Sequence, residues 1–236
     1  MKEQLITSSA MGRGGDLENV EVFLKFEGTN GGSTFIDSSG KGRIFTRNGA
    51  STTTSTTQVK VGTSSGKFVG SSKNQSSIYT PTDSALDLAE KDFTIEFWLY
   101  PQAWATIGPV ILQWGQRFIG NWVGVGLSNG LFAWELLDGS NSVLYSLISP
   151  TVLAANQWSH VALVRSGTTV KVFINGNEDI SGTYAGSFTA GVSRLTIGEF
   201  YRADADTQNY PYTGYMDQLK ITVGKALYNG NFIVGE

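Results

Sequence analysis

Stretches of alternating apolar and polar residues, separated by glycine-containing turns, recur along most of this 236-residue sequence. In the clearest stretch, 93–100, the apolar residues fall on one face of an extended chain: Phe93, Ile95, Phe97 and Leu99. Alternation with a period of two predicts a strand that buries one face in a core. Pro101 follows directly and is expected to end the strand, because proline has no N–H to donate to a sheet.

Pairs of these stretches are joined by tight-turn signals, which predict β-hairpins. An Asn-Gly pair at 129–130 separates 121–127 from 131–137, and a Ser-Gly turn separates 158–165 from 170–174. Asn-Gly tolerates the positive φ angles that two-residue hairpin turns require. Roughly a dozen short strands with almost no helical pattern predict an all-β protein, built as an antiparallel sandwich of two sheets.

The composition argues against several classes of function. Charged residues make up 16% of the chain, the net charge is −3, and lysines and arginines are scattered singly. We expect no nucleic-acid partner, because phosphate binding needs clustered cations. We also expect no membrane association, since the apolar stretches are only strand length and the first ten residues lack the pattern of a signal peptide. The sequence contains no cysteine, so disulfides and thiolate metal sites are excluded.

The first nineteen residues differ from the rest of the chain. Residues 11–16 carry three glycines and no periodicity, which predicts an extended N-terminal arm over 1–19 followed by one domain over 20–236. Free arms of this composition fray at their ends. We therefore expect a partner subunit to order the arm, and the chain to be part of a homo-oligomer in its assembly.

Several strings resemble the laminin-G-like branch of the concanavalin-A-like jelly rolls: Phe93–Trp98, Trp158–Arg165, Phe173–Gly176, Leu195–Gly198 and Gly214–Ile221. Two more, Leu24–Gly31 and Gly224–Tyr228, are similar to the beginning and the end of the version common in tailed-bacteriophage virion proteins. The resemblance covers about residues 20–233 and implies a jelly-roll sandwich. Fold alone does not settle function, since members of this kind bind glycans, proteins or calcium or serve as structural appendages.

The phage-like strings imply a place on a virion. We expect a non-catalytic structural protein on the virion surface, either a capsid decoration or a tail-fibre accessory. Its arm would contact other virion proteins, and its sandwich would present a surface for which host-surface glycans are candidate ligands. Two alternatives stay open: a stand-alone, extracellular carbohydrate-binding lectin module and, with less support, a glycan hydrolase.

Catalysis has little support in the sequence. Some enzymes on this fold carry the string Glu-x-Asp-x-x-Glu, because glycoside hydrolysis needs two neighbouring carboxyl groups. That string is absent here: Glu96 stands alone on its predicted strand, while Glu135 and Asp138 are three residues apart. The only histidine, His160, is interpreted as a packed strand residue rather than a proton-transfer group.

A structural calcium ion is a candidate cofactor, because hard cations take carboxylate oxygens from loops. Glu27, Asp37 and Asp217 occupy acidic positions of the resembling strings, although related strings more often have Asp in place of Glu27. Asp204 and Asp206, in the long loop that follows Glu199, form a separate candidate pair. Each acid also has a structural interpretation; Asp37, for example, can accept a backbone N–H in an Asx-type turn.

Aromatic side chains in loops are the predicted glycan-binding residues, because sugar rings stack their C–H faces on exposed aromatic rings. Four stand in predicted loops: Trp104, Tyr201, Tyr210 and Tyr212. Trp122 is a fifth, because Gly124 and Gly126 share its strand face and leave space there for a ligand or another backbone. Trp98 and Trp158 are expected in the core.

Overall fold

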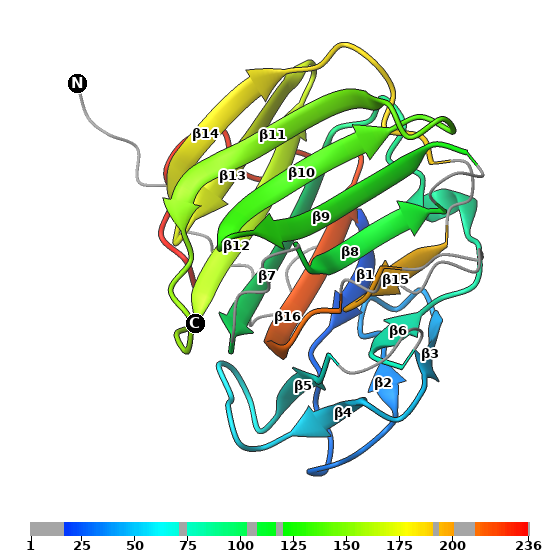
Figure 1. The fold of residues 1–236 in the computed structure, drawn as a ribbon, viewed down its shortest axis with the longest axis vertical. Helices are drawn as coiled ribbons and strands as arrows, with labels where there is room; N and C mark the ends of the chain where they lie inside the picture. The colour runs from blue at the N-terminus through cyan, green and yellow to red at the C-terminus, as the bar shows by residue number, and fades with distance from the viewer. Residues whose placement is uncertain are drawn as a thin grey trace.

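The structure is a computed structural model that describes residues 17–70, 75–102, 108–116, 120–190, 194–200 and 211–235. Two antiparallel eight-stranded sheets lie face to face, so that β8–β11 stand in front of β7, β12 and β13 in Figure 1. The predicted fold class, an all-β jelly-roll sandwich, is confirmed. The predicted arm, 1–19, lies almost entirely outside the described residues.

The first sheet has the strand order β14-β13-β12-β7-β16-β5-β4, and β1 also pairs with β16. Its strands are β1 (Val20–Leu24), β4 (Thr52–Ser55), β5 (Ser65–Phe68), β7 (Phe93–Pro101), β12 (Ser159–Ser166), β13 (Thr169–Ile174), β14 (Asn177–Thr183) and β16 (Gly214–Val223).

The second sheet has the order β11-β10-β9-β8-β15-β6-β3-β2. Its strands are β2 (Phe35–Ile36), β3 (Ile44–Asn48), β6 (Ser77–Tyr79), β8 (Val110–Gly115), β9 (Trp122–Ser128), β10 (Leu131–Leu137), β11 (Val143–Val152) and β15 (Leu195–Ile197). One 3-10 turn, η1 (Ser84–Leu86), precedes β7. Among the described residues, no helix has the length and apolarity that crossing a bilayer would require.

The core lies between the two sheets, and the alternating residues of β7 reach it as predicted. The side chains at 93, 95, 97 and 99 are fully buried. Phe97 meets Phe132 of β10 with 6.3 Å between ring centroids, and Phe93 meets Trp134 at 5.8 Å. Burying large apolar side chains supplies the main driving force for stacking the sheets. The strand ends at Pro101, also as predicted.

A β-bulge in β16 changes which of its residues face outward. The register pairs Asp217 with Trp98 and Lys220 with Glu96, so three residues of β16 span two residues of β7. The extra residue is accommodated where Gln218 has a positive φ of 49°. Without the bulge, positions 217 and 220 would point to opposite faces, because side chains alternate along a strand. Both instead lie opposite outward-facing residues of β7.

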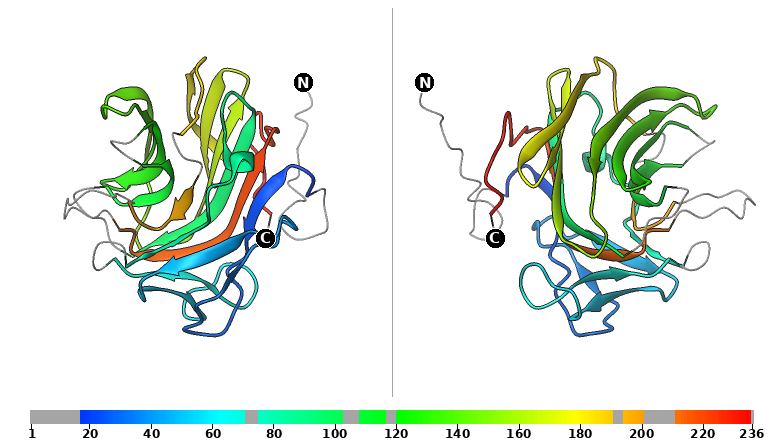
Figure 2. Two further views of the ribbon diagram at one scale, coloured as in Figure 1. Left: turned by 90° about the vertical axis from the view of Figure 1, so that its right-hand side faces the viewer. Right: turned by 60° about the vertical axis from the view of Figure 1, so that its left-hand side comes forward.

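Residues 225–235, called here the C-terminal segment, cover part of the outer face of the first sheet. Figure 2 shows this segment, in red, on the side of the sheet that faces away from β8–β11. Tyr228 and Phe232 pack on Ala162, Val164 and Phe173 in a small apolar cluster separate from the core. Additional support comes from β7, where the Thr94 hydroxyl accepts the Leu227 N–H at 2.9 Å.

Candidate functional site

A row of aromatic side chains crosses the outer face of the first sheet. Tyr100 of β7 lies between Trp158, which precedes β12, and Tyr215 of β16, with ring centroids 5.4 and 5.7 Å away. Trp158 and Tyr100 are partly exposed, whereas Tyr215 is buried. Lys67 of β5 pairs with Tyr215 and continues the row towards the next strand. We call Trp158, Tyr100 and Tyr215 the aromatic row.

A lysine lies beside this row on a loop held against the sheet. The Lys60 ammonium is 4.2 Å from the centre of the Trp98 ring, within the range of a cation–π contact. The loop is fixed by Asp217, whose carboxylate accepts the N–H groups of Lys60 and Val61 at 3.1 and 3.0 Å. Trp98 itself is 8% exposed and lies on the outer face. Trp98 is therefore buried as expected, although on the outer face of the sheet, whereas the expectation was wrong for Trp158, which is partly exposed.

Next to Trp98, a buried ion cluster joins the sheet to the C-terminal segment. Oε1 of Glu96 is 2.6 Å from the Lys220 ammonium, and Oε2 accepts the Tyr228 hydroxyl at 2.6 Å. His160 Nε2 lies 3.6 Å from the same Oε2 and is fully buried, as expected of a packed strand histidine. Burial alone would raise the pKa of Glu96, but His160 and Lys220 outweigh it and hold that pKa at about 2.

The ion cluster has the properties of a structural site. A carboxyl group with a pKa of about 2 is ionised at neutral pH and cannot act as a general acid there. Glu96 is fully buried under the C-terminal segment, so no substrate reaches it in this structure. Asp138, another acid weighed for catalysis, accepts the N–H groups of Ser140 and Ser142 in a turn, each at 2.8 Å. None of these contacts is an arrangement that cleaves a glycoside.

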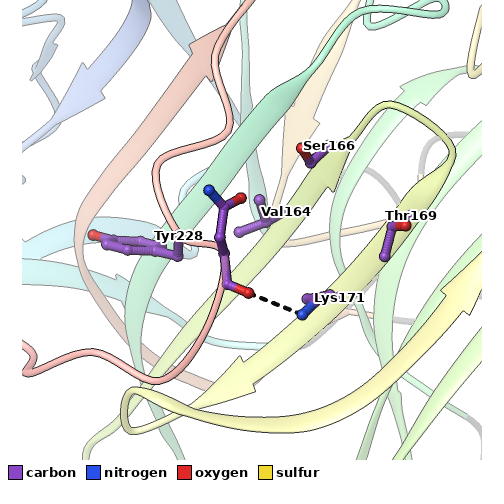
Figure 3. A pocket seen from close by; sticks show the side chains of 6 residues that line it. Val164, Ser166, Thr169, Lys171 and Tyr228 are labelled. Atoms are coloured by element: carbon purple, nitrogen blue, oxygen red, sulfur yellow. Dashed lines mark hydrogen bonds between the residues drawn. The ribbon is translucent and has the colours of Figure 1, made fainter. Parts of the chain in front are cut away.

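A small pocket opens farther along the same outer face, at the β12–β13 hairpin. Its cavity of about 160 Å³ is lined by Val164, Ser166, Thr169, Lys171, Tyr228 and Asn229. Figure 3 shows the four hairpin side chains on two adjacent strands with Tyr228 opposite them. Lys171 donates to Oε2 of Glu178 at 2.7 Å and to the backbone oxygen of Asn229 at 3.0 Å. We call this cavity the hairpin pocket.

Two of the predicted glycan-binding aromatics lie inside the fold. Trp122 is 4% exposed and packs against Phe200, in a cluster with Val110 and Leu137. Tyr212 is 1% exposed, and its hydroxyl donates to the backbone oxygen of Tyr215 at 3.0 Å. Neither ring offers a face to a sugar, so both predictions are corrected. The other three, Trp104, Tyr201 and Tyr210, lie outside the described residues.

The space beside the glycines near Trp122 is occupied by other groups of the protein. A Cβ added at Gly124 would lie 1.9 Å from the Trp122 indole, so this glycine accommodates that ring. At Gly126 an added Cβ would lie 2.9 Å from the backbone oxygen of Pro109. The sequence suggested that these glycines leave space either for a ligand or for another backbone segment. The second interpretation holds for Gly126. The space for a ligand beside Trp122 is absent, because the indole itself fills it.

Three of the predicted calcium ligands already serve as acceptors for the protein. Asp37 accepts the Phe23 N–H at 2.9 Å and the Ser39 N–H at 3.0 Å, the latter in the predicted Asx-type turn. Glu27 accepts the Thr63 N–H at 3.1 Å. Asp217 holds the loop that carries Lys60, as described above. These hydrogen bonds give each of the three acids a structural role in the protein.

The described residues also contain no group of three or more His, Cys, Asp or Glu side chains that could hold a metal ion. Asp204 and Asp206 lie outside the described residues. The prediction of calcium stays a prediction.

A family model described as the concanavalin A-like lectin/glucanases superfamily matches residues 72–227, about two thirds of the chain. The chain belongs to this superfamily. No curated protein sequence gives a significant match. The superfamily contains both binding proteins and enzymes by its own description, so the assignment fixes the fold and leaves the activity to be argued from the site.

Solved structures of the superfamily fold resemble this one at low sequence identity. The binding domain of Paraclostridial Mosquitocidal Protein 1 has a TM-score of 0.68 and 17% identity, over 90% of this chain and 50% of that one. A structure of botulinum neurotoxin type C, from work on the dependence of its cell entry on two ganglioside molecules, has a TM-score of 0.67 and 15% identity. The match covers 90% of this chain and 49% of that one. Our chain thus spans about half the length of these toxin chains.

A third structure matches over nearly its whole length. It is domain 4 of AbnA, an extracellular arabinanase from Geobacillus stearothermophilus, in complex with arabinotriose. Its TM-score is 0.62 and its identity 19%, over 88% of this chain and 94% of that one. At these identities the likeness establishes a shared fold.

Sequence reasoning missed the aromatic row, although its signal was present. Tyr100 occupies an outward-facing position of the alternating stretch 93–100, and Trp158 stands two residues before His160 on the same face. These two outward-facing aromatic residues were therefore available in the sequence as candidates beside the loop aromatics. The pairing of β7 with β12, which brings the two rings together, could not be read from either stretch alone.

Proposed function

We propose that the domain binds carbohydrate at the aromatic row and performs no reaction there. The observation that carries this proposal is the pair of partly exposed rings, Tyr100 and Trp158, 5.4 Å apart on the outer face of the sheet. Aromatic rings on rigid strands offer a large apolar surface at low entropic cost. A sugar can stack its C–H face on them while Lys67, next to Tyr215, supplies a hydrogen-bond donor.

Proteins of similar fold support this proposal. The AbnA domain was solved with arabinotriose, and the neurotoxin type C structure concerns binding to gangliosides. The two acids on this face support the absence of turnover, since both are buried: Glu96 is held in an ion pair, and Asp217, which is nearer the row, accepts backbone N–H groups. A hydrolase would instead release new reducing ends from a bound polysaccharide, and we expect none.

A glycan array probed with the full chain tests the carbohydrate proposal. Binding to at least one glycan class is expected, with Tyr100→Ala and Trp158→Ala each weakening it about tenfold, which corresponds to about 1.4 kcal/mol. Ile44→Ala is the matched control, because it truncates an exposed apolar side chain of β3, on the other sheet. Equal binding by all four proteins, or no binding to any glycan, would contradict the proposal.

We further propose that the sandwich is displayed on the surface of a tailed-bacteriophage particle, as a capsid decoration or a tail accessory. The support is the pair of phage-like strings, Leu24–Gly31 and Gly224–Tyr228. In this proposal residues 1–19 join the domain to other virion proteins. A chain without residues 1–19 should fold but fail to enter particles assembled in its presence. Normal incorporation of the shortened chain would refute the role of the arm.

Self-association is the last element of the proposal, and the edge strand β11 supports it. Val143, Leu144, Ile148 and Val152 are exposed on this strand, which pairs with β10 alone. No charged residue occurs from Val143 to Val152. Natural sheets often protect their edges with charged residues. An uncharged apolar edge can instead pair with the same edge of a second copy of the chain, because the two identical strands carry no like charges that would repel each other.

A further inference from the structure

We propose that the hairpin pocket is a second sugar site, separate from the aromatic row, which holds one uncharged monosaccharide unit of a glycan. The proposal rests on the proposed carbohydrate-binding function and adds a place and a ligand class to it. The cavity of about 160 Å³ is well below the range typical of drug-sized ligands, about 300–1,000 Å³. Its size therefore favours a single ring over an oligosaccharide.

The register of the hairpin places an apolar floor beside polar walls. Val164 of β12 pairs with Lys171 of β13, and Ser166 pairs with Thr169 two residues closer to the turn. All four side chains line the same cavity (Figure 3). A pyranose has the complementary pattern, because its C–H groups form an apolar face and its hydroxyls project from the rim. Val164 is 1% exposed and closes the floor of the cavity, while the hydroxyls of a sugar can meet Ser166 and Thr169.

The polar groups of the pocket have capacity left for a ligand. In the described part of the chain, the hydroxyls of Ser166 and Thr169 and the side-chain amide of Asn229 form no hydrogen bond with protein. Lys171 uses two of its three N–H donors, on Glu178 and on the Asn229 backbone. The pocket thus offers donors from all four residues and acceptors from three. Sugar hydroxyls are both donors and acceptors and can use this mixed set.

Charge favours a neutral ligand over an anionic one. Lys171 is the cation of the pocket, and its ammonium is paired with the Glu178 carboxylate at 2.7 Å. A second acid, Asp92, lies at the hairpin turn, where its Oδ1 accepts the Gly167 N–H at 2.7 Å. An anionic sugar in the pocket would meet a lysine that the Glu178 carboxylate already offsets, with Asp92 at the adjacent turn. Such an arrangement disfavours a further negative charge.

The wall formed by the C-terminal segment is held in place before any ligand arrives. The Tyr228 ring stacks on Phe232 with 3.6 Å between centroids and an interplanar angle of 7°. Its hydroxyl donates to Glu96 at 2.6 Å, in the buried ion cluster. A preformed wall lowers the conformational entropy lost on binding, which matters most for a ligand that makes few contacts.

The hairpin pocket and the aromatic row can be tested separately. Trp158 and Ser166 lie eight residues apart along the extended chain of β12, which corresponds to about 26 Å at roughly 3.3 Å per residue. One monosaccharide cannot reach both places. A variant at one site should therefore leave the other site intact.

The test is a chemical-shift titration of the isotope-labelled full chain with the methyl glycosides of glucose, galactose, mannose and N-acetylglucosamine. At least one should give saturable shifts at residues 164–171 and 228–230. Ser166→Trp should abolish these shifts by filling the cavity. Asn229→Ala removes the amide but keeps the backbone oxygen that Lys171 uses, and should weaken binding about fivefold, the effect of one hydrogen bond. Trp158→Ala is the control and should leave the pocket shifts unchanged.

Each other outcome overturns a stated part of the proposal. Shifts confined to the surroundings of Tyr100 and Trp158 would rule out the hairpin pocket as a sugar site, while the proposed function would still be supported. No saturable shift with any glycoside would remove the pocket, and the glycan array then decides the proposed function separately. Stronger binding of methyl glucuronide than of methyl glucoside would overturn the uncharged ligand class. If Ser166→Trp fails to fold, Asn229→Ala decides, and an unchanged affinity in that variant overturns the site.

Discussion

The Lys220 ammonium lies 2.6 Å from Oε1 of Glu96, and both side chains are buried on the outer face of the first sheet. The bulge in β16 makes this pairing possible, because it turns Lys220 to the face on which Asp217 also lies. Burying two charges is unfavourable unless they are paired and hydrogen-bonded. Tyr228 completes the arrangement from the C-terminal segment, so one ion pair connects β7, β16 and the end of the chain.

Glu96→Gln should destabilise the protein by about 3–5 kcal/mol, because it leaves the Lys220 ammonium buried without a counter-charge. Urea unfolding followed by tryptophan fluorescence measures this change. Glu135→Gln is the control, since Glu135 is a partly exposed acid of β10 and its replacement should have an effect of at most about 0.5 kcal/mol. Similar stability of the two variants would mean that the ion cluster contributes little to the fold.

Acid should weaken the protein through the same carboxylate. The pKa of Glu96 is lowered from 4.5 to about 2 in the folded protein, so the folded state holds its proton less tightly than the unfolded chain. This contribution to stability is complete above pH 4.5 and is lost as the pH falls from 4.5 towards 2. Urea unfolding of wild type and of Glu96→Gln at several pH values in that window should show the difference between them shrinking as the pH falls.

Asp217 has the opposite pH dependence. Burial raises its pKa from 3.8 to about 7, against hydrogen bonds from Val61, Lys60 and Gln218 that lower it. The folded state therefore binds the proton more tightly than the unfolded chain, and ionisation destabilises it progressively from about pH 4 to pH 7. Asp217→Asn cannot ionise, so its stability relative to wild type should rise with pH across that window. A stability difference that stays constant from pH 4 to pH 7 would contradict this assignment.

The parts of the fold that could be predicted from the sequence are those set by alternation within one strand. The inward face of β7 is an example, because a period of two identifies which side chains are buried together. The turn at Asp37 is another, because an Asx-type turn needs only residues two apart.

The site was harder to predict because it depends on contacts between distant segments. Trp122 is buried by Phe200, which is far away in sequence. The pairing of Lys220 with Glu96 depends on a one-residue bulge that no alternation signals, since the bulge itself interrupts the alternation. Tyr100 and Trp158 meet only because β7 and β12 are neighbours in the sheet.

Gly124→Ala should destabilise the protein by about 1–3 kcal/mol, because the added methyl group would displace the Trp122 indole from its packed position. Gly230→Ala is the matched control, since an added Cβ there meets nothing within 4 Å. Urea unfolding of both variants measures the difference. If Gly124→Ala is as stable as Gly230→Ala, the Trp122 ring has another place to lie, and the burial of this tryptophan is not fixed by the glycine.

Self-association through β11 predicts a specific response to charge. Asp179 of β14 contacts the hydroxyls of Ser149 and Thr151 at one end of this strand, and Pro150 has no N–H to donate there. The half of β11 from Val143 to Ile148 is then the part open to a second copy.

Ile148→Lys tests this interface, because it places a charge at a position whose side chain is 46% exposed, and two copies related by a two-fold axis would bring two such charges together. Light scattering after gel filtration should show wild type at a multiple of the chain mass and Ile148→Lys as a monomer. Ile44→Lys, on β3 and 73% exposed, should remain associated like wild type. Loss of association in both variants would show that added charge acts non-specifically, and a monomeric wild type would remove β11 as an interface in the free protein.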